Sequence, residues 1–385
     1  MEIYLDNSAT TMVAPEVREE MMAALGEDYG NPSSLHRKGS DAEMMLKKAK
    51  ERVASPLKAD PREIYFTSGG TEANNLALLG GARAKKRQGD HVIISAVEHP
   101  SVSAAAEELA REGFRVTRIG TDARGLVSPD ELEAALTPQT VLVSVMAVNN
   151  EVGAREPFEE IGRRVKAFDS RILFHVDAVQ AYGKIRIVPK QCGIDLLTAS
   201  GHKIHGPKGI GFLYIRDRVH IEPIIYGGEQ QKGIRSGTEN MPGIVGMGRA
   251  AQLAYERFDE RIAGLYELKE YFQHALESLD GVRINGPRER ELSAPHIVSA
   301  TFPGVRSEVL LHALEDKGVY ASAGSACSSH KKTVSPTLHA IGLSDELASS
   351  TLRFSLSSYT QREELEAAAA AVGELRPVLR RFTRK

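Results

Sequence analysis

The sequence predicts an α/β fold in which a mainly parallel seven-stranded sheet is flanked by helices and joined to a smaller α+β domain. Short apolar segments alternate with helical stretches from about residue 60 to 215, which is typical of a parallel sheet covered on both faces. The chain has 385 residues, more than the ~250–300 at which a single core stops growing. Two domains are therefore expected.

Each element has its own pattern. The strands are expected at 63–68, 91–96, 114–120, 141–148, 171–178, 194–200 and 209–215, because these segments are short and rich in β-branched residues. Apolar residues at helical spacing predict helices at 14–26, 41–54, 71–88 and 100–113, and a long helical run at about 243–279. The remaining residues predict strands at 296–304 and within 350–358, a helix at 307–318 and an Ala/Glu-rich helix at the end. The expected domains are an arm at 1–15, a large domain at 16–255 and a small domain at 256–385, to which the N-terminal residues contribute.

Composition excludes several classes of function. The 49 basic residues nearly balance the 51 acidic ones, so neither direct nucleic-acid binding nor attachment to an anionic membrane is expected. No apolar run approaches the ~18 residues that span a bilayer, and the first residues lack a secretory pattern. Two cysteines cannot build a disulfide framework, so a cytoplasmic location is expected.

Polar side chains follow the predicted strands where each strand ends. Ligands in parallel α/β sheets bind beyond the carboxyl ends of the strands, so these residues are expected to converge. Each of them alone suits a cap or a loop, but together they indicate a site. They are Gly70 and Thr71, Glu98 and His99, Asn149 and Asn150, Asp177 and Gln180, and Ser200, His202 and Lys203.

This set matches the needs of pyridoxal phosphate (PLP). The cofactor needs a lysine for its aldehyde, an acid for its ring nitrogen, a phosphate cradle and a cover for its ring. Lys203 suits a Schiff-base lysine, and Asp177 can keep the ring nitrogen protonated. Thr71, Ser200 and His202 can hold the phosphate, beside a Gly-Gly pair that precedes a helix. His99 can stack on the ring, and Gln180 can reach its phenolic oxygen.

Several motifs together resemble one family over essentially the whole chain. They are "TSGGTEANNLA", "VEH", "NNEVG", "HVDAVQ", "SGHKIHGPKG", "RSGT" and "SAGSAC". The chain resembles the cysteine desulfurases of group I, the NifS-like enzymes, which are class V members of the PLP-dependent transferases of fold type I. The likeness extends from "YLDNSATT" to "STLRFSLS".

The resemblance implies an activity and a role for each residue. Lys203 would bind PLP, and Cys327 would be the nucleophile that carries a persulfide while L-cysteine becomes L-alanine. Around PLP it places Gly70, Thr71, His99, Asn150, Asp177, Gln180, Ser200 and His202. Thr238 would reach the phosphate of the neighbouring subunit's cofactor, which implies a homodimer. Arg353, with Asn150, would hold the substrate carboxylate bidentately.

Cys327 lies in a polar segment with an unusual composition. Small residues precede it at 322–326, and His330, Lys331 and Lys332 follow it. These cations favour the thiolate, which is the reactive form, and the small residues leave the backbone free to deliver sulfur. His99 is expected to shuttle the proton of the substrate thiol. The acceptor is expected to be a protein, either an iron–sulfur scaffold or a tRNA-thiolation enzyme.

Three alternatives remain open. One is a metal site made of Cys327, His330, His202 and His205, but these residues lack the paired spacing of zinc ligands. No metal is expected on the protein alone, although Cys327 could be a transient iron–sulfur ligand. An aminotransferase or selenocysteine lyase of the same fold would use the same cofactor. A catalytically silent sulfur carrier would not need Lys203 and Asp177.

Cys192 is expected to be a packed core thiol. The 31–36 segment matches the family without an assigned role.

Overall fold

The computed structural model describes residues 2–323 and 335–383. Its larger part is built on a seven-stranded sheet, which confirms the predicted fold class. The strand order is β2-β8-β7-β6-β5-β3-β4, and β8 runs in the direction opposite to the other six strands. The strands are β2 (Ile64–Thr67), β3 (His91–Ser95), β4 (Arg115–Ile119), β5 (Thr140–Met146), β6 (Leu173–Asp177), β7 (Leu196–Ser200) and β8 (Gly211–Ile215).

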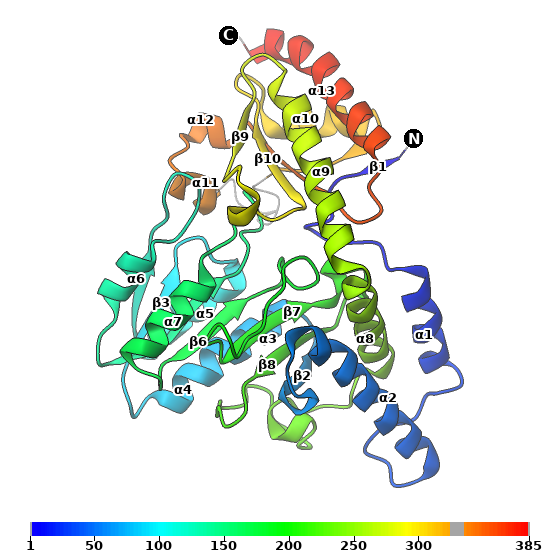
Figure 1. Cartoon of the computed structure of the whole chain (residues 1–385), viewed down its shortest axis with the longest axis vertical. Helices are drawn as coiled ribbons and strands as arrows, with labels where there is room; N and C mark the ends of the chain where they lie inside the picture. The colour runs from blue at the N-terminus through cyan, green and yellow to red at the C-terminus, as the bar shows by residue number, and fades with distance from the viewer. Residues whose placement is uncertain (1, 324–334, 384–385) are drawn as a thin grey trace.

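Helices cover both faces of this sheet (Figure 1). One core contains apolar residues of α2, α7 and α8, and the other contains those of α3 to α5. Every residue of β3, β5, β6 and β7 is buried, as expected of strands covered on two sides. The helices are α1 (Pro15–Leu25), α2 (Arg37–Ala54), α3 (Gly70–Asn75), α4 (Gly81–Lys85), α5 (Pro100–Arg111), α6 (Pro129–Ala135), α7 (Phe158–Phe168) and α8 (Met241–Tyr255).

The helix predicted at 71–88 contains a π-helical turn, η3 (Leu76–Gly80), between α3 and α4. The Glu222 N–H donates to the Gly80 carbonyl at 3.0 Å, so this helix carbonyl accepts a hydrogen bond from a neighbouring segment. A Cβ at Gly80 would lie 2.3 Å from the Glu222 carbonyl oxygen. Glycine is therefore required where the two backbones meet.

The helical run predicted at about 243–279 is present, but a break divides it into two helices. The first, α8, ends at Tyr255, and α9 (Phe258–Glu277) begins three residues later. Between them Arg257 has φ +47°, a left-handed conformation that ends an α-helix. The rings of Tyr255 and Phe258 stack at 5.1 Å across the break, which stabilises the change of direction.

A smaller four-stranded sheet, in the order β12-β13-β10-β9, lies above the large one in Figure 1. The N-terminal strand β1 pairs in parallel with β11 beside it. The core packs Phe354 edge-to-face against Phe272 and Phe302. The elements are β1 (Ile3–Tyr4), β9 (Arg283–Asn285), β10 (Ile297–Thr301), α10 (Ser307–Glu315), β11 (Val319–Tyr320), β12 (Ser322–Ala323), α11 (Pro336–Ala340), α12 (Asp345–Ala348), β13 (Thr351–Ser355) and α13 (Arg362–Thr383).

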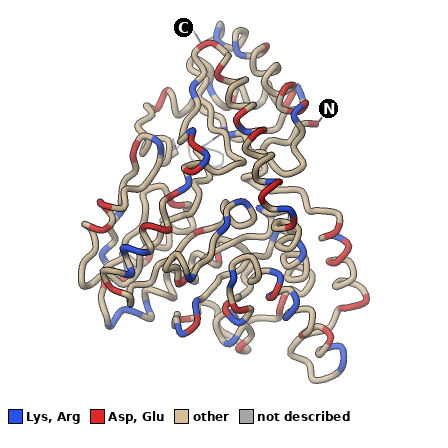
Figure 2. Tube along the Cα trace, viewed as in Figure 1, with Lys and Arg blue, Asp and Glu red and all other residues tan. Residues whose placement is uncertain are grey.

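Charged residues of both signs alternate over the described chain (Figure 2). Many of them form surface ion pairs, such as Arg164 with Asp130, Glu133 and Glu160. None of the helices built from the described residues is long and apolar enough to cross a membrane. Cys192 is buried in the core of the large sheet, as predicted, and burial raises the pKa of its thiol.

A buried carboxyl in the large sheet gives stability a pH dependence. Glu156 is 1 % exposed, and its Oε2 accepts from the Val127 N–H at 2.8 Å. Its Oε1 has no hydrogen-bond partner among the residues that the structure describes. Burial raises the pKa of Glu156 to about 8, above the ~4.3 of an unfolded chain. The stability that depends on the protonated carboxyl is therefore complete below about pH 4.3 and is lost as the pH rises through about 8.

Glu156→Gln removes this titration but keeps the shape of the side chain. Between pH 5 and 8 the variant's free energy of unfolding should rise relative to the wild type by up to about 1.4 kcal/mol for each pH unit. Urea unfolding of both proteins at the two pH values measures the change. An equal difference at pH 5 and pH 8 would contradict it.

Candidate active site

A cavity of about 260 Å³ lies at the carboxyl ends of β5, β6 and β7. The structure brings ten of the predicted site residues to its wall, which come from segments far apart in the sequence. They are Gly70, Thr71, His99, Asn150, Asp177, Gln180, Ser200, His202, Lys203 and Arg353. Asn74, Ser101, Met146, Val148 and Val179 complete the wall together with Ser8 and Ala9 of the N-terminal segment.

Asp177 is a buried carboxylate at the end of β6, and it is 4 % exposed. Its Oδ2 accepts from Asn74 Nδ2 at 2.8 Å, and its Oδ1 accepts from the Val179 N–H at 2.9 Å. Within the part of the chain that the structure describes, no cation lies within ion-pair distance of Asp177. A buried carboxylate without a cation is costly, so this position suits a cationic partner that arrives with a ligand.

Lys203 follows β7 and projects into the same cavity. Its Nζ donates to the carbonyl of Ser8, and to that of Ala9 at 2.8 Å. The segment around Lys203 is fixed by the N-terminal arm, because the Thr11 N–H donates to the His202 carbonyl at 2.9 Å. The amine is therefore held near Asp177 by backbone that comes from the start of the chain.

His99 caps α5 and lies on the cavity wall. Its Nδ1 accepts from the Ser101 N–H at 3.1 Å and lies 2.8 Å from Ser101 Oγ. The Ser101 hydroxyl in turn accepts from Asn74 Nδ2 at 2.9 Å. Burial, opposed by Asp177 and reinforced by Lys203, lowers the pKa of His99, so the ring is neutral at pH 7. Because Nδ1 accepts, the proton of the neutral ring sits on Nε2.

The cavity wall also offers donors suited to a phosphate. Gly69 (φ +155°, ψ −174°) precedes α3 in a conformation reserved for glycine. The first N–H groups of a helix have no partner within the helix, and here they belong to Gly70 and Thr71. No described residue hydrogen-bonds the Ser200 hydroxyl. His202 Nδ1 lies 3.2 Å from Thr10 Oγ1, and burial, with Lys203 and Lys208, lowers the pKa of His202 to about 4.

Arg353, in β13 of the small sheet, closes the cavity. It is 7 % exposed. Its Nη2 pairs with Asp6 Oδ1 at 2.9 Å, and its Nη1 donates to the Asn150 carbonyl at 2.8 Å. Its buried Nε has no partner among the described residues. The guanidinium plane is thus fixed on one edge and keeps a donor for an anion.

Gln180 is held from two sides. Its Nε2 donates to the Ser8 carbonyl at 3.0 Å, and its Oε1 lies 3.3 Å from His296 Nε2. Burial lowers the pKa of His296 well below its usual range. A neutral His296 can donate from Nε2, so Gln180 has a defined orientation in the cavity wall.

Three predicted features lie elsewhere. Thr238 is exposed and lines a separate cavity with Ser68 and Arg235. Cys327, with the cations that follow it, lies outside the described residues. In the 31–36 segment, His36 caps α2 by accepting from the Gly39 N–H at 3.3 Å, which is a structural role.

The metal alternative gains no support from the described residues. His202 Nδ1 meets the Thr10 hydroxyl, and His205 Nδ1 lies 2.9 Å from the Met12 carbonyl. Among residues 2–323 and 335–383, no group of three or more potential ligands is arranged for a metal. The other two residues of that alternative, Cys327 and His330, fall among residues 324–334.

Sequence reasoning missed the residues that support the site. Asn74 joins Asp177 to Ser101, whereas Asp6 and Ser8 fix Arg353 and Lys203. The "TEANN" motif contains Asn74 one turn after the glycine pair, and that position is a usable signal. The contacts of Asp6 and Ser8 depend on the arm folding back over the cavity, and no local pattern indicates this.

The described residues fit PLP. The buried carboxylate of Asp177, which lacks a cation, suits a protonated ring nitrogen. Lys203 supplies an amine for the aldehyde, and the open donors around Thr71 and Ser200 suit a phosphate. The three groups line one cavity, so a single cofactor of this kind can meet all of them.

Comparison with known proteins agrees with this geometry. The model of the aminotransferase class-V family matches residues 3–368. A cysteine desulfurase named IscS from Dictyoglomus turgidum is 44% identical over 365 residues, or 94% of this chain and 92% of that protein. A solved structure titled a NifS-like protein has a TM-score of 0.92 and 38% identity, and the match covers 98% of this chain and all of that one. The structure titled "SspA in complex with cysteine" has a TM-score of 0.79 and 35% identity, with 93% and 100% covered.

Proposed function

This chain belongs to the aminotransferase class-V family and, within it, to the PLP-dependent cysteine desulfurases, and from that premise we propose which residues perform the reaction. Lys203 binds the cofactor and moves the proton, and Arg353 orients L-cysteine. Cys327 receives the sulfur. The observation that carries the proposal is the single cavity shared by Lys203, Asp177 and Arg353.

PLP, when bound, supplies an aldehyde that takes up the substrate amine and a ring that accepts the electrons released at Cα. Lys203 holds that aldehyde until L-cysteine arrives. Asp177 keeps the ring nitrogen protonated, and Asn74 holds Asp177 in place. Gly70, Thr71, Ser200 and His202 bind the phosphate.

Arg353 binds the substrate carboxylate through Nε and one Nη. Asp6 and the Asn150 carbonyl already fix the plane of the guanidinium, so little side-chain freedom is lost when the substrate binds. The Asn150 side chain borders the same space. A carboxylate in this position places the substrate's Cα beside Lys203.

Proton movements then fall to two residues. Lys203, once released as a free amine, takes the proton from Cα and returns it later in the reaction. His99 exchanges protons with the substrate at Nε2, because its Nδ1 accepts from Ser101. A lowered pKa keeps the ring ready for that exchange at neutral pH.

Cys327 performs the sulfur transfer. Its thiolate attacks the sulfur of the substrate, so that a sulfur–sulfur bond forms and the substrate's carbon–sulfur bond breaks. The electron pair of the broken bond stays on the substrate carbon, which is then protonated and leaves as L-alanine. His330, Lys331 and Lys332 favour the thiolate. The persulfide passes to an acceptor protein of the iron–sulfur or tRNA-thiolation kind, in a reducing, cytoplasmic compartment.

The homodimer is also part of the proposal. Thr238 is exposed and does not line its own chain's active-site cavity, which is compatible with a hydroxyl that serves the partner's phosphate. Such a hydrogen bond to a charged group contributes about 1.5–3 kcal/mol. Thr238→Ala should therefore weaken PLP binding by about 10- to 100-fold.

Mixed dimers test whether Thr238 acts in trans. One chain carries Lys203→Ala and the other carries Thr238→Ala, and each has a different affinity tag. If Thr238 serves the partner, one of the two sites in the mixed dimer contains both Lys203 and Thr238. The mixed dimer should then have one site per dimer with wild-type PLP affinity, and about half of the wild-type activity. The homodimer of each variant is the control. A mixed dimer whose sites all bind PLP as weakly as the Thr238→Ala homodimer would contradict the trans assignment.

A further inference from the structure

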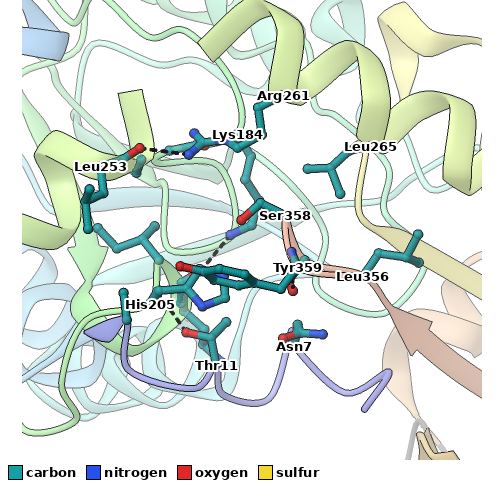
Figure 3. Close-up of a pocket in the computed structure, with 16 residues that line it drawn as sticks. Asn7, Thr11, Lys184, His205, Leu253, Arg261, Leu265, Leu356, Ser358 and Tyr359 are labelled. Carbon is teal, nitrogen blue, oxygen red and sulfur yellow. Dashed lines mark hydrogen bonds between the residues drawn. The ribbon is translucent and has the colours of Figure 1, made fainter. Parts of the chain in front are cut away.

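Lys203 lines a second cavity, of about 180 Å³, as well as the active-site cavity. Figure 3 shows the residues of this second cavity. The cavity is enclosed by the N-terminal arm, the segment around His205, the helices α8 and α9, and the residues that follow β13. Its wall includes Lys184, Lys203, His205, Leu253, Arg261 and Tyr359. The mechanism above uses none of these residues except Lys203.

Two cations line this cavity without an acidic partner. Lys184 Nζ donates to the Lys203 carbonyl at 2.9 Å, and Arg261 donates to the carbonyls of Leu253 and Gly183 at 2.9 and 3.3 Å. No described carboxylate lies within ion-pair distance of either cation. The charged groups that act on Lys184 are Lys203 and Arg261, both positive. Glu256 acts on Arg261 from a distance but does not line the cavity.

Such an arrangement is unfavourable without an anion. Burial and the two neighbouring positive charges lower the pKa of Lys184 to about 7, and burial lowers that of Arg261. Backbone carbonyls satisfy only some of the donors on each side chain. Figure 3 shows Lys184 reaching toward the rings of His205 and Tyr359, with Arg261 beside it. Both side chains therefore border one cavity.

The rest of the wall defines the body of the ligand. Ala14, Ile204, Leu253, Ala254, Leu265 and Leu356 make much of it apolar. A phosphate, with nearly two charges and several oxygens, would leave acceptors against these aliphatic groups at a high desolvation cost. No described acidic residue lines the cavity, so no carboxylate in its wall pairs with the ammonium of an amino acid such as L-cysteine.

We propose that this cavity is a binding site for a small aliphatic carboxylate, held by Lys184 and Arg261 and separate from the site of L-cysteine. The carboxylate accepts from both cations, and its hydrocarbon chain packs against Leu253 and Leu265. The inference goes beyond the desulfurase reaction, and it does not depend on the roles given to Cys327 or Arg353.

Calorimetric titration of the PLP-bound protein with butanoate tests this site. One butanoate per chain is expected to bind, and n-butylammonium, which has the same body and the opposite charge, is not. Lys184→Met and Arg261→Leu should each weaken binding by about ten- to a hundredfold, as the loss of a charged hydrogen bond implies. Lys47→Met removes an exposed lysine on α2 and is the matched control, with unchanged binding.

Arg353→Lys separates this cavity from the active site, because butanoate held by Arg353 would respond to that change. Retained binding in Arg353→Lys together with its loss in Lys184→Met supports the proposal. Binding that survives both Lys184→Met and Arg261→Leu, or that disappears only in Arg353→Lys, overturns it. Inorganic phosphate binding as tightly as butanoate, or no butanoate binding to the wild type, also overturns it. Thermal unfolding and the visible cofactor band identify any variant that has not folded. If either Lys184→Met or Arg261→Leu fails to fold, the butanoate affinity of the other variant tests the proposal.

Discussion

Replacing Lys203 with alanine is expected to lower alanine formation from L-cysteine by a factor of about 10² to 10⁴, the range for losing a positioned acid–base group. The substitution removes both the amine that binds the cofactor and the base that takes the Cα proton. The visible absorbance of the cofactor bound through Lys203 should disappear as well. Alanine release and the absorbance spectrum, measured with added PLP, give the two readouts.

Lys208→Ala is the matched control for this prediction. Lys208 is exposed and lies five residues later in the same "SGHKIHGPKG" segment, so its loss should leave both readouts close to wild type. Lys203 also contacts the Ser8 and Ala9 carbonyls, so thermal unfolding must show that Lys203→Ala is folded. A folded Lys203→Ala protein that forms alanine at the wild-type rate would contradict the assignment.

Cys327→Ser is expected to abolish sulfur loading on the protein and transfer to an acceptor. A serine hydroxyl stays protonated at neutral pH, whereas the thiolate is the nucleophile for sulfur transfer. Without an attacking thiolate, the carbon–sulfur bond of the substrate has no sulfur acceptor on the protein. Protein-bound labile sulfur and alanine, measured after addition of L-cysteine, should therefore fall together.

Cys192→Ala separates this effect from the general loss of a thiol. Cys192 is 8 % exposed in the core of the large sheet, and burial raises the pKa of its thiol, so it is a poor nucleophile. Its replacement should cost some stability and leave sulfur loading intact. The result with Cys327→Ser would also separate a desulfurase from an aminotransferase of this fold, because an aminotransferase would not need Cys327.

Much of the fold could be predicted from the sequence because its strands are buried on both faces. Strands such as β5 and β6 consist of buried residues only, so their sequences are short apolar runs between helices. The break between α8 and α9 was missed because Arg257 is an ordinary helix former. The rings on either side of Arg257 contact residues from a distant segment, Tyr182 against Tyr255 and Arg186 over Phe258, and no local pattern indicates these tertiary contacts.

The site could be predicted where chemistry follows directly after a strand. Asp177 ends β6 and Lys203 follows β7, so the rule for parallel sheets brings them together. Asp6 and Ser8 could not be found this way, because Asp6 meets Arg353 and Ser8 meets the cavity only when the arm folds over it. The sequence also gives no sign of the second cavity, since Lys184 and Arg261 come from unrelated segments.

The most direct test of the central proposal is to locate the sulfur itself. The PLP-bound protein is treated with L-cysteine, free thiols are alkylated under non-reducing conditions, and the proteolytic peptides are examined by mass spectrometry. The peptide that contains Cys327 should carry one additional sulfur atom that a thiol reductant removes, while the peptide that contains Cys192 should not. Additional sulfur on Cys192 alone, or alanine formed with no sulfur on Cys327, would contradict the proposed mechanism.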